Sequence, residues 1–170
     1  MNSPEIWTPH ATVATLIEQD GHFLLVEERD SEGRQVFNQP AGHVEERESI
    51  LDAAVRETLE ETGWRVELTY FIGIYTYLAY NGVTYYRFCF AANALQKDQS
   101  ATLDTDIVGT HWLTRDDLLE RRSQWRSPLL MQCIDDYLAG KRFPLDLIYE
   151  HPVSNTSETP SSTQQPEAES

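Results

Sequence analysis

Basic residues are scarce in this sequence, which has 13 Lys and Arg against 28 Asp and Glu in 170 residues and a formal net charge of −15. Proteins that bind nucleic-acid polymers usually present basic surfaces, so this balance argues against such a partner. A small anionic substrate would meet the same unfavourable field. We therefore expect a phosphorylated substrate to be held through a bridging metal ion.

Cysteine and long apolar runs are also lacking. The two cysteines, Cys89 and Cys133, have no motif spacing, and each lies in an apolar run typical of a buried, reduced thiol. No run approaches the roughly 18 apolar residues of a membrane span, and the N-terminus has no basic-then-apolar export signal. These absences predict a cytoplasmic protein outside the membrane. Four histidines show no metal-ligand spacing, which argues against zinc: His10, His22, His111 and His151.

The chain has the length of one domain. Beyond about Glu150 its composition changes to Ser, Thr, Pro and Glu, with Val153 as the last large aliphatic residue. Such a segment cannot bury enough apolar surface to offset its ordering entropy. We expect a folded domain at 1–150 and a disordered acidic Ser/Thr/Pro-rich tail at 151–170.

An acidic helix is the most distinctive feature. The run 49–62 holds good helix formers and no proline, Ser49 can cap its start, and Gly63 is a natural stop. Helical winding brings three carboxylates to one face, and that face carries no lysine: Glu57, Glu60 and Glu61. A solvated acidic face is the ordinary interpretation, but clustered carboxylates without lysine suit a hard divalent cation such as magnesium.

The acidic helix belongs to a longer pattern at 42–63 that resembles the Nudix box, G-x5-E-x7-R-E-U-x-E-E-x-G-U. The seven matching residues are Gly42, Glu48, Arg56, Glu57, Glu60, Glu61 and Gly63. The sequence departs from the box at Thr58, which occupies an aliphatic position, and at the bulky Trp64. The blocks "FNQPAGH", "YYRFCF", "DTDI", "RSPLL" and "FPLDLI" are similar to those of the NudJ-type branch of Nudix phosphatases, over about residues 8 to 148.

This resemblance implies an α/β fold, a Nudix-type α/β/α sandwich with a mixed sheet and a catalytic loop-helix-loop. It implies dependence on Mg2+, with Mn2+ able to substitute, and release of phosphate from thiamine-type pyrophosphates and nucleoside di- and triphosphates. The metal would be held by Glu57, Glu60 and Glu61, with a backbone carbonyl of Ala41 or Gly42 completing its shell.

The roles of other residues follow from the resemblance combined with local chemistry. Asp106, shortly after Asp104 in a loop before a strand, would serve the metal or the attacking water, and Glu57, Glu60 or Asp106 could accept the water's proton. Glu48 and Arg56 lie about two helical turns apart, so an ion pair between them would brace the loop to the helix, a structural role shared by Gly63.

Substrate contacts are expected from three residues outside the acidic helix. Gly42 lets the backbone approach a ligand closely, and His43 follows it within reach of a phosphate oxygen. Arg87, beside aromatic residues, would donate paired hydrogen bonds to a phosphate group. The tyrosines around it are expected to pack within the sheet.

Turn signals divide the rest of the chain. Two strands flank Asp20-Gly21, and two longer ones flank Asn81-Gly82, where a two-residue turn would pair Thr76 with Arg87. A capping box at Thr114 and Asp117 starts a short helix. Ser127-Pro128 opens the last helix, which ends near Gly140.

Two other functions remain open. The Nudix box indicates a metal site but does not indicate which phosphoanhydride bond is cleaved. A Nudix nucleotide pyrophosphohydrolase that releases pyrophosphate and nucleoside monophosphate is therefore one alternative. A non-catalytic Nudix binding module is another. In each case we expect a monomer whose partner is a small-molecule diphosphate or nucleotide.

Truncation after Glu150 should leave melting temperature and activity essentially unchanged, because the tail offers no apolar face to the domain. Thermal unfolding and initial rates of the full-length and truncated chains provide the measurement. A large drop in either quantity would show that the tail belongs to the folded unit.

Overall fold

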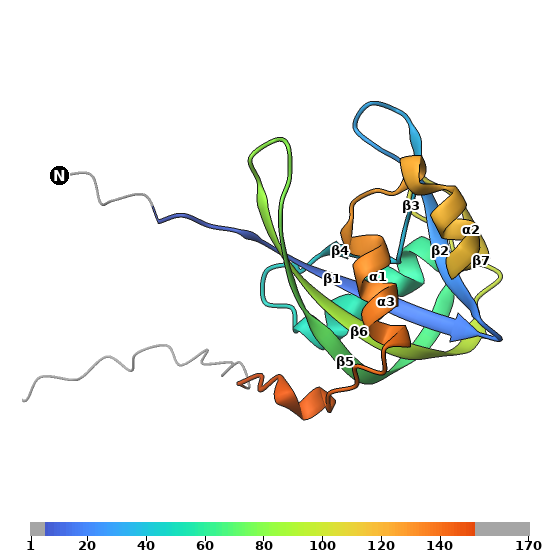
Figure 1. The fold of residues 1–170 in the computed structure, drawn as a ribbon. Helices are drawn as coiled ribbons and strands as arrows, with labels where there is room; N and C mark the ends of the chain where they lie inside the picture. Colours follow the sequence, from blue (N-terminus) through green and yellow to red (C-terminus); the bar gives the residue numbers. More distant parts are fainter. Residues whose placement is uncertain (1–5, 152–170) are drawn as a thin grey trace, which may run out of the picture.

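The computed structural model describes residues 6–151. Its elements follow the order of Figure 1: β1 (His10–Gln19), β2 (His22–Arg29), β3 (Gln35–Asn38), β4 (Ala41–His43), α1 (Ile50–Thr62), β5 (Trp64–Leu78), β6 (Thr84–Lys97), β7 (Ile107–Thr114), α2 (Arg115–Glu120), a 3-10 turn (Arg122–Gln124), α3 (Leu129–Leu138) and a second 3-10 turn (Leu145–Leu147). The tail predicted at 151–170 lies outside the described residues except for His151.

The strands form one mixed sheet. Its main order is β3-β2-β1-β6-β5, while β4 pairs with β1 and β7 pairs with β2. β1 and β6 run parallel, and the other pairs are antiparallel. The parallel pair is made possible by the crossover through α1, which carries the chain back across the sheet.

Helices cover both faces of this sheet, α1 on one and α2 with α3 on the other (Figure 1). The alternation of β1 sets this arrangement, because Ala14 and Leu16 pack toward α3 whereas Val13 and Ile17 pack on the side of α1. The α/β/α sandwich expected from the sequence is therefore confirmed.

Local signals fix α1 at both ends. The Ser49 hydroxyl accepts the Asp52 N–H at 2.9 Å, and Gly63 ends the helix in the left-handed region with φ 71°. The Glu150 carboxylate accepts the Ile50 N–H at 2.7 Å, so the end of the domain also caps this helix. Thr58, the departure from the box, is fully buried and donates its hydroxyl to the Ala54 carbonyl at 2.7 Å. The polar atom is satisfied within the helix.

The first hairpin turns at Asp20-Gly21 as expected, with Gln19 opposite His22. The register expected for the second hairpin is wrong. The Ala79 N–H donates to the Val83 carbonyl, so the loop holds three residues, 80–82, with Gly82 left-handed. This one-residue change places Arg87 opposite Tyr75 instead of Thr76, and brings different side chains to its face.

The later elements match the sequence signals. Thr114 and Asp117 form the reciprocal capping box of α2, and Gly140 follows α3 in a left-handed conformation. Cys89 and Cys133 are buried free thiols. No helix within residues 6–151 is long and apolar enough to cross a membrane.

Candidate active site

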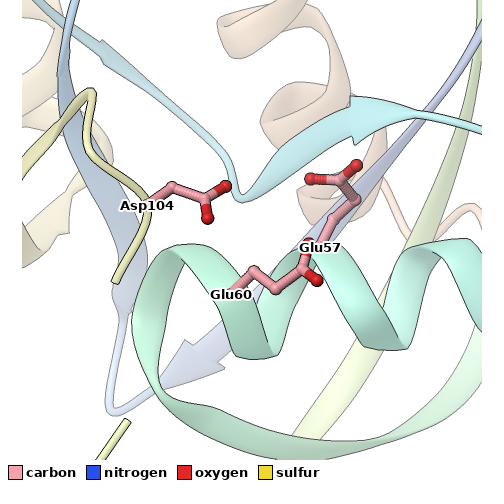
Figure 2. A group of neighbouring side chains, drawn as sticks. All are labelled: Glu57, Glu60 and Asp104. Atoms are coloured by element: carbon pink, nitrogen blue, oxygen red, sulfur yellow. The ribbon is translucent and has the colours of Figure 1, made fainter. Parts of the chain in front are cut away.

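Three carboxylates from two segments converge at the site. Glu57 and Glu60 come from α1, and Asp104 reaches them from the loop before β7, with one oxygen of each lying within 4.8 Å of the others (Figure 2). The loop is fixed to the helix because the Asp104 N–H donates to the Glu60 carbonyl at 3.1 Å. The structure thus brings Asp104 to the acidic face, whereas the exposed Asp106 contributes its backbone carbonyl to the Arg29 N–H at 3.1 Å.

Glu61 lies deeper than this group. Its residue exposure is 8 %, and its Oε2 accepts the Ala41 N–H at 2.8 Å. Burial raises the pKa of Glu61 to about 9, and the negative charges of Glu28, Glu57 and Asp104 add to the rise. The hydrogen bond from Ala41 acts in the opposite direction. Without a cation, this carboxyl group favours its protonated form at neutral pH.

Glu57 is packed against the backbone of β4. A Cβ atom added to Gly42 would overlap the Glu57 carboxyl group, so a larger residue at this position would displace that carboxyl group. Burial raises the pKa of Glu57, an effect that the neighbouring Arg56 opposes. Gly42 therefore leaves room for the Glu57 carboxyl group, and it also lines the neighbouring cleft.

Arg56 connects most of these groups. Its guanidinium donates to both oxygens of Glu48, at 2.6 and 2.8 Å, which is the brace expected from their spacing. It also donates to Glu57 at 2.8 Å, to Glu60 at 2.9 Å and to the His43 carbonyl at 3.0 Å. These acceptors raise the pKa of Arg56, Glu48 most strongly, so its charge is permanent.

A cleft of about 600 Å³ opens beside Gly42. Arg87 lines it and donates to the Gln39 side chain at 3.2 Å, while its Nε is buried without a hydrogen-bond partner in the described part of the chain. His43 also lines it, and its ring nitrogen lies 3.0 Å from that of His10. Burial, together with His10, lowers the pKa of His43.

Sequence reasoning missed several residues that the fold brings to this cleft: Glu28, Asn38, Tyr77, Tyr85, Trp125 and Arg126. The tyrosines were expected only to pack, and Tyr75 does so, donating to Asp136 at 2.9 Å. Tyr77 also packs against the core, as expected. In addition, Tyr77 and Tyr85, opposite each other in the corrected register, line the cleft together with Arg87. The available signal was the alternation of Tyr85 with Arg87 along β6.

The donor set suits a hard divalent cation. Its side-chain ligands are all carboxylate oxygens, the type that magnesium and calcium prefer, and histidine and thiolate are absent from this group. Their like charges are only partly balanced by Arg56. The residues present therefore fit a metal ion of this class.

Comparisons with known proteins agree with this geometry. The family model described as NUDIX domain matches residues 7–133. The curated Phosphatase NudJ of Escherichia coli (strain K12) is 37% identical over 143 residues, covering 84% of this chain and 92% of that protein. A solved NUDIX hydrolase from Nitrosomonas europaea is 45% identical with a TM-score of 0.83, covering 85% and 98% of the two chains. A MutT protein from Methanosarcina mazei Go1, 19% identical with a TM-score of 0.66 over 81% and 100%, shares the fold.

The buried Glu61 predicts a pH effect on stability without metal. Its folded pKa of about 9 exceeds its ordinary value of 4.5, so its contribution is complete below pH 4.5 and is lost as pH rises through 9. Melting temperatures of the chelator-treated protein should therefore fall relative to those of Glu61→Gln across this range. The variant keeps an acceptor for Ala41 and cannot titrate. A difference between the two proteins that is constant with pH would contradict the assignment.

Proposed function

Because this chain belongs to the Nudix hydrolase family, we propose that it is a magnesium-dependent phosphatase that releases orthophosphate from thiamine pyrophosphate, hydroxymethylpyrimidine pyrophosphate and nucleoside di- and triphosphates. Hydrolysis of phosphoanhydrides is the family's chemistry. The observation that carries the proposal is the cluster of three carboxylates, Glu57, Glu60 and Asp104. Gly42 lies against this cluster and also lines the cleft that holds Arg87.

The carboxylates would hold the metal. Glu57, Glu60 and Asp104 offer converging oxygens, and Glu61 would join them once a cation displaces its proton. Bound magnesium supplies charge neutralisation on the diphosphate and a lower pKa for the attacking water. Arg56 keeps the glutamates oriented through its hydrogen bonds.

Proton transfer from the water needs an accessible carboxylate. The side chain of Glu60 is 43% exposed, compared with 11% for that of Glu57, so we assign the acceptor role to Glu60. Asp106, exposed in the same loop as Asp104, is the second candidate.

The cleft would bind the rest of the substrate. Arg87 can donate to a phosphate, His43 and the backbone at Gly42 border the end near the carboxylates, and Tyr77 and Tyr85 offer aromatic surface. Aromatic contact accepts several ring systems, whereas selection of one base requires hydrogen bonds to its edge. This composition supports a permissive enzyme acting on both thiamine-type and nucleoside substrates.

Release of orthophosphate is favoured over release of pyrophosphate by the name of the curated relative, a phosphatase. Solved neighbours described as a UDP-X diphosphatase and an ADP-ribose pyrophosphatase are 19% and 18% identical and bear on the fold alone. The full carboxylate set argues against a non-catalytic binding module. We further propose a cytoplasmic monomer, consistent with its two free thiols.

Glu57→Gln and Asp104→Asn should each lower kcat by about two orders of magnitude, because each removes a proposed metal ligand. Asp52→Asn is the matched control, since Asp52 is exposed on the same helix and does not belong to the cluster of three carboxylates. Steady-state rates at saturating magnesium, with melting temperatures to verify folding, are the measurement. Wild-type turnover by both site variants would exclude the metal assignment.

The bond cleaved can be read from the first products. With magnesium and a nucleoside triphosphate, terminal attack yields nucleoside diphosphate and orthophosphate, which phosphorus NMR resolves. Thiamine pyrophosphate should give thiamine monophosphate and orthophosphate. Pyrophosphate with nucleoside monophosphate as the initial pair would assign the protein to the pyrophosphohydrolase class, and no turnover of any diphosphate would favour the binding module.

A further inference from the structure

The segment 125–127, between the 3-10 turn and α3, lines the cleft with a rigid backbone. The Arg126 N–H donates to the Phe37 carbonyl at 2.9 Å, which attaches the segment to β3. The Trp125 indole N–H donates to the Leu118 carbonyl at 2.8 Å, which attaches it to α2. The backbone that carries Arg126 is therefore attached to the rest of the domain on both sides before any ligand arrives.

The side chain of Arg126 has unused donors. It is 41% exposed, and within residues 6–151 its guanidinium pairs only with Glu28, whose Oε1 lies 3.8 Å from its Nε. That distance is too long for a hydrogen bond, and Glu28 Oε1 is itself buried without a hydrogen-bond partner in the described part. The Glu28 carboxylate thus orients Arg126 electrostatically and leaves its N–H groups available.

The other arginines of the cleft are more fully occupied. Arg34 donates to Asp30 at 2.8 Å and also lies 3.1 Å from Glu32, so its charge is balanced on its own loop. Arg87 already donates to the amide oxygen of Gln39. Arg126 is therefore the cleft arginine with the greatest capacity to accept a new anionic partner.

A diphosphate or triphosphate carries more negative charge than one metal centre can neutralise, and the chain as a whole is strongly acidic. We propose that Arg126 is a substrate-binding residue that contacts, together with Arg87, a phosphate outside the metal centre, and that Glu28 positions it. Arginine suits this task because its planar donors match phosphate oxygens in pairs. This inference rests on one part of the proposed function, namely that a phosphoanhydride substrate binds in the cleft.

The test is equilibrium binding of methylenediphosphonate, a non-hydrolysable diphosphate, to the full chain with magnesium, followed by tryptophan fluorescence. Arg126→Gln should raise Kd about tenfold, as expected for loss of a charge-assisted hydrogen bond. Arg126→Lys keeps the charge but loses the paired donors, so it should raise Kd only about threefold. Arg65→Gln is the matched control, because it removes the same charge from an exposed side chain outside the cleft lining, and it should leave Kd unchanged at physiological salt.

Kinetics give a second readout. Arg126→Gln should raise KM with kcat altered by less than about twofold, because the carboxylate centre is untouched. An unchanged Kd in Arg126→Gln with a wild-type melting temperature would overturn the inference, as would an equal effect in Arg65→Gln. Because the binding test does not depend on which product forms, release of pyrophosphate would refute the proposed function and leave the role of Arg126 standing.

Discussion

The site depends on the guanidinium of Arg56. Four hydrogen bonds join it to the carboxylates of Glu48, Glu57 and Glu60, and a fifth joins it to the carbonyl of His43. Glutamates crowded on one helix face repel one another, and this single permanent charge opposes that repulsion. It also connects α1 to the loop that precedes it, so the same bonds that balance charge set the geometry.

Charge balance by Arg56 is incomplete, and the excess negative charge favours binding of a cation. Glu61 is buried, bonded to one backbone N–H and surrounded by other acids, which raises its pKa. Such a group must lose its proton before it can ligate a cation, so proton release and metal binding are coupled. The close approach of Gly42 to Glu57 keeps this centre compact. Crowding of these acids carries an electrostatic cost that the proposed divalent cation would relieve.

The proposed substrate contacts lie in a different part of the sandwich. Arg87 and the tyrosines come from β5 and β6, whereas Trp125 and Arg126 come from the segment before α3. The carboxylates lie on the side of α1, and Gly42 on β4 connects the two regions. In the proposed function, this division separates the centre that cleaves the bond from the residues that bind the remainder of the phosphorylated ligand.

Helix ends, tight turns and ion pairs between nearby residues could be predicted from the sequence, because they depend on residues close together in the chain. Ser49 and Gly63 define α1, Asp20-Gly21 defines a tight turn, and the spacing of Glu48 and Arg56 anticipates their ion pair. The packed structure was needed to distinguish the positions of Asp104 and Asp106. A backbone hydrogen bond to α1 places Asp104 beside Glu57 and Glu60.

Long-range contacts account for the rest. A third loop residue in the β5–β6 hairpin changed the face that Arg87 shares with its neighbours, and turn propensity alone does not count loop residues. Arg126 comes to the cleft through a bond to Phe37, about ninety positions away in the chain. The pKa of Glu61 likewise arises from burial and from charges on distant segments. Such properties belong to the packed molecule, because sequence patterns report a residue's neighbours along the chain and burial depends on its neighbours in space.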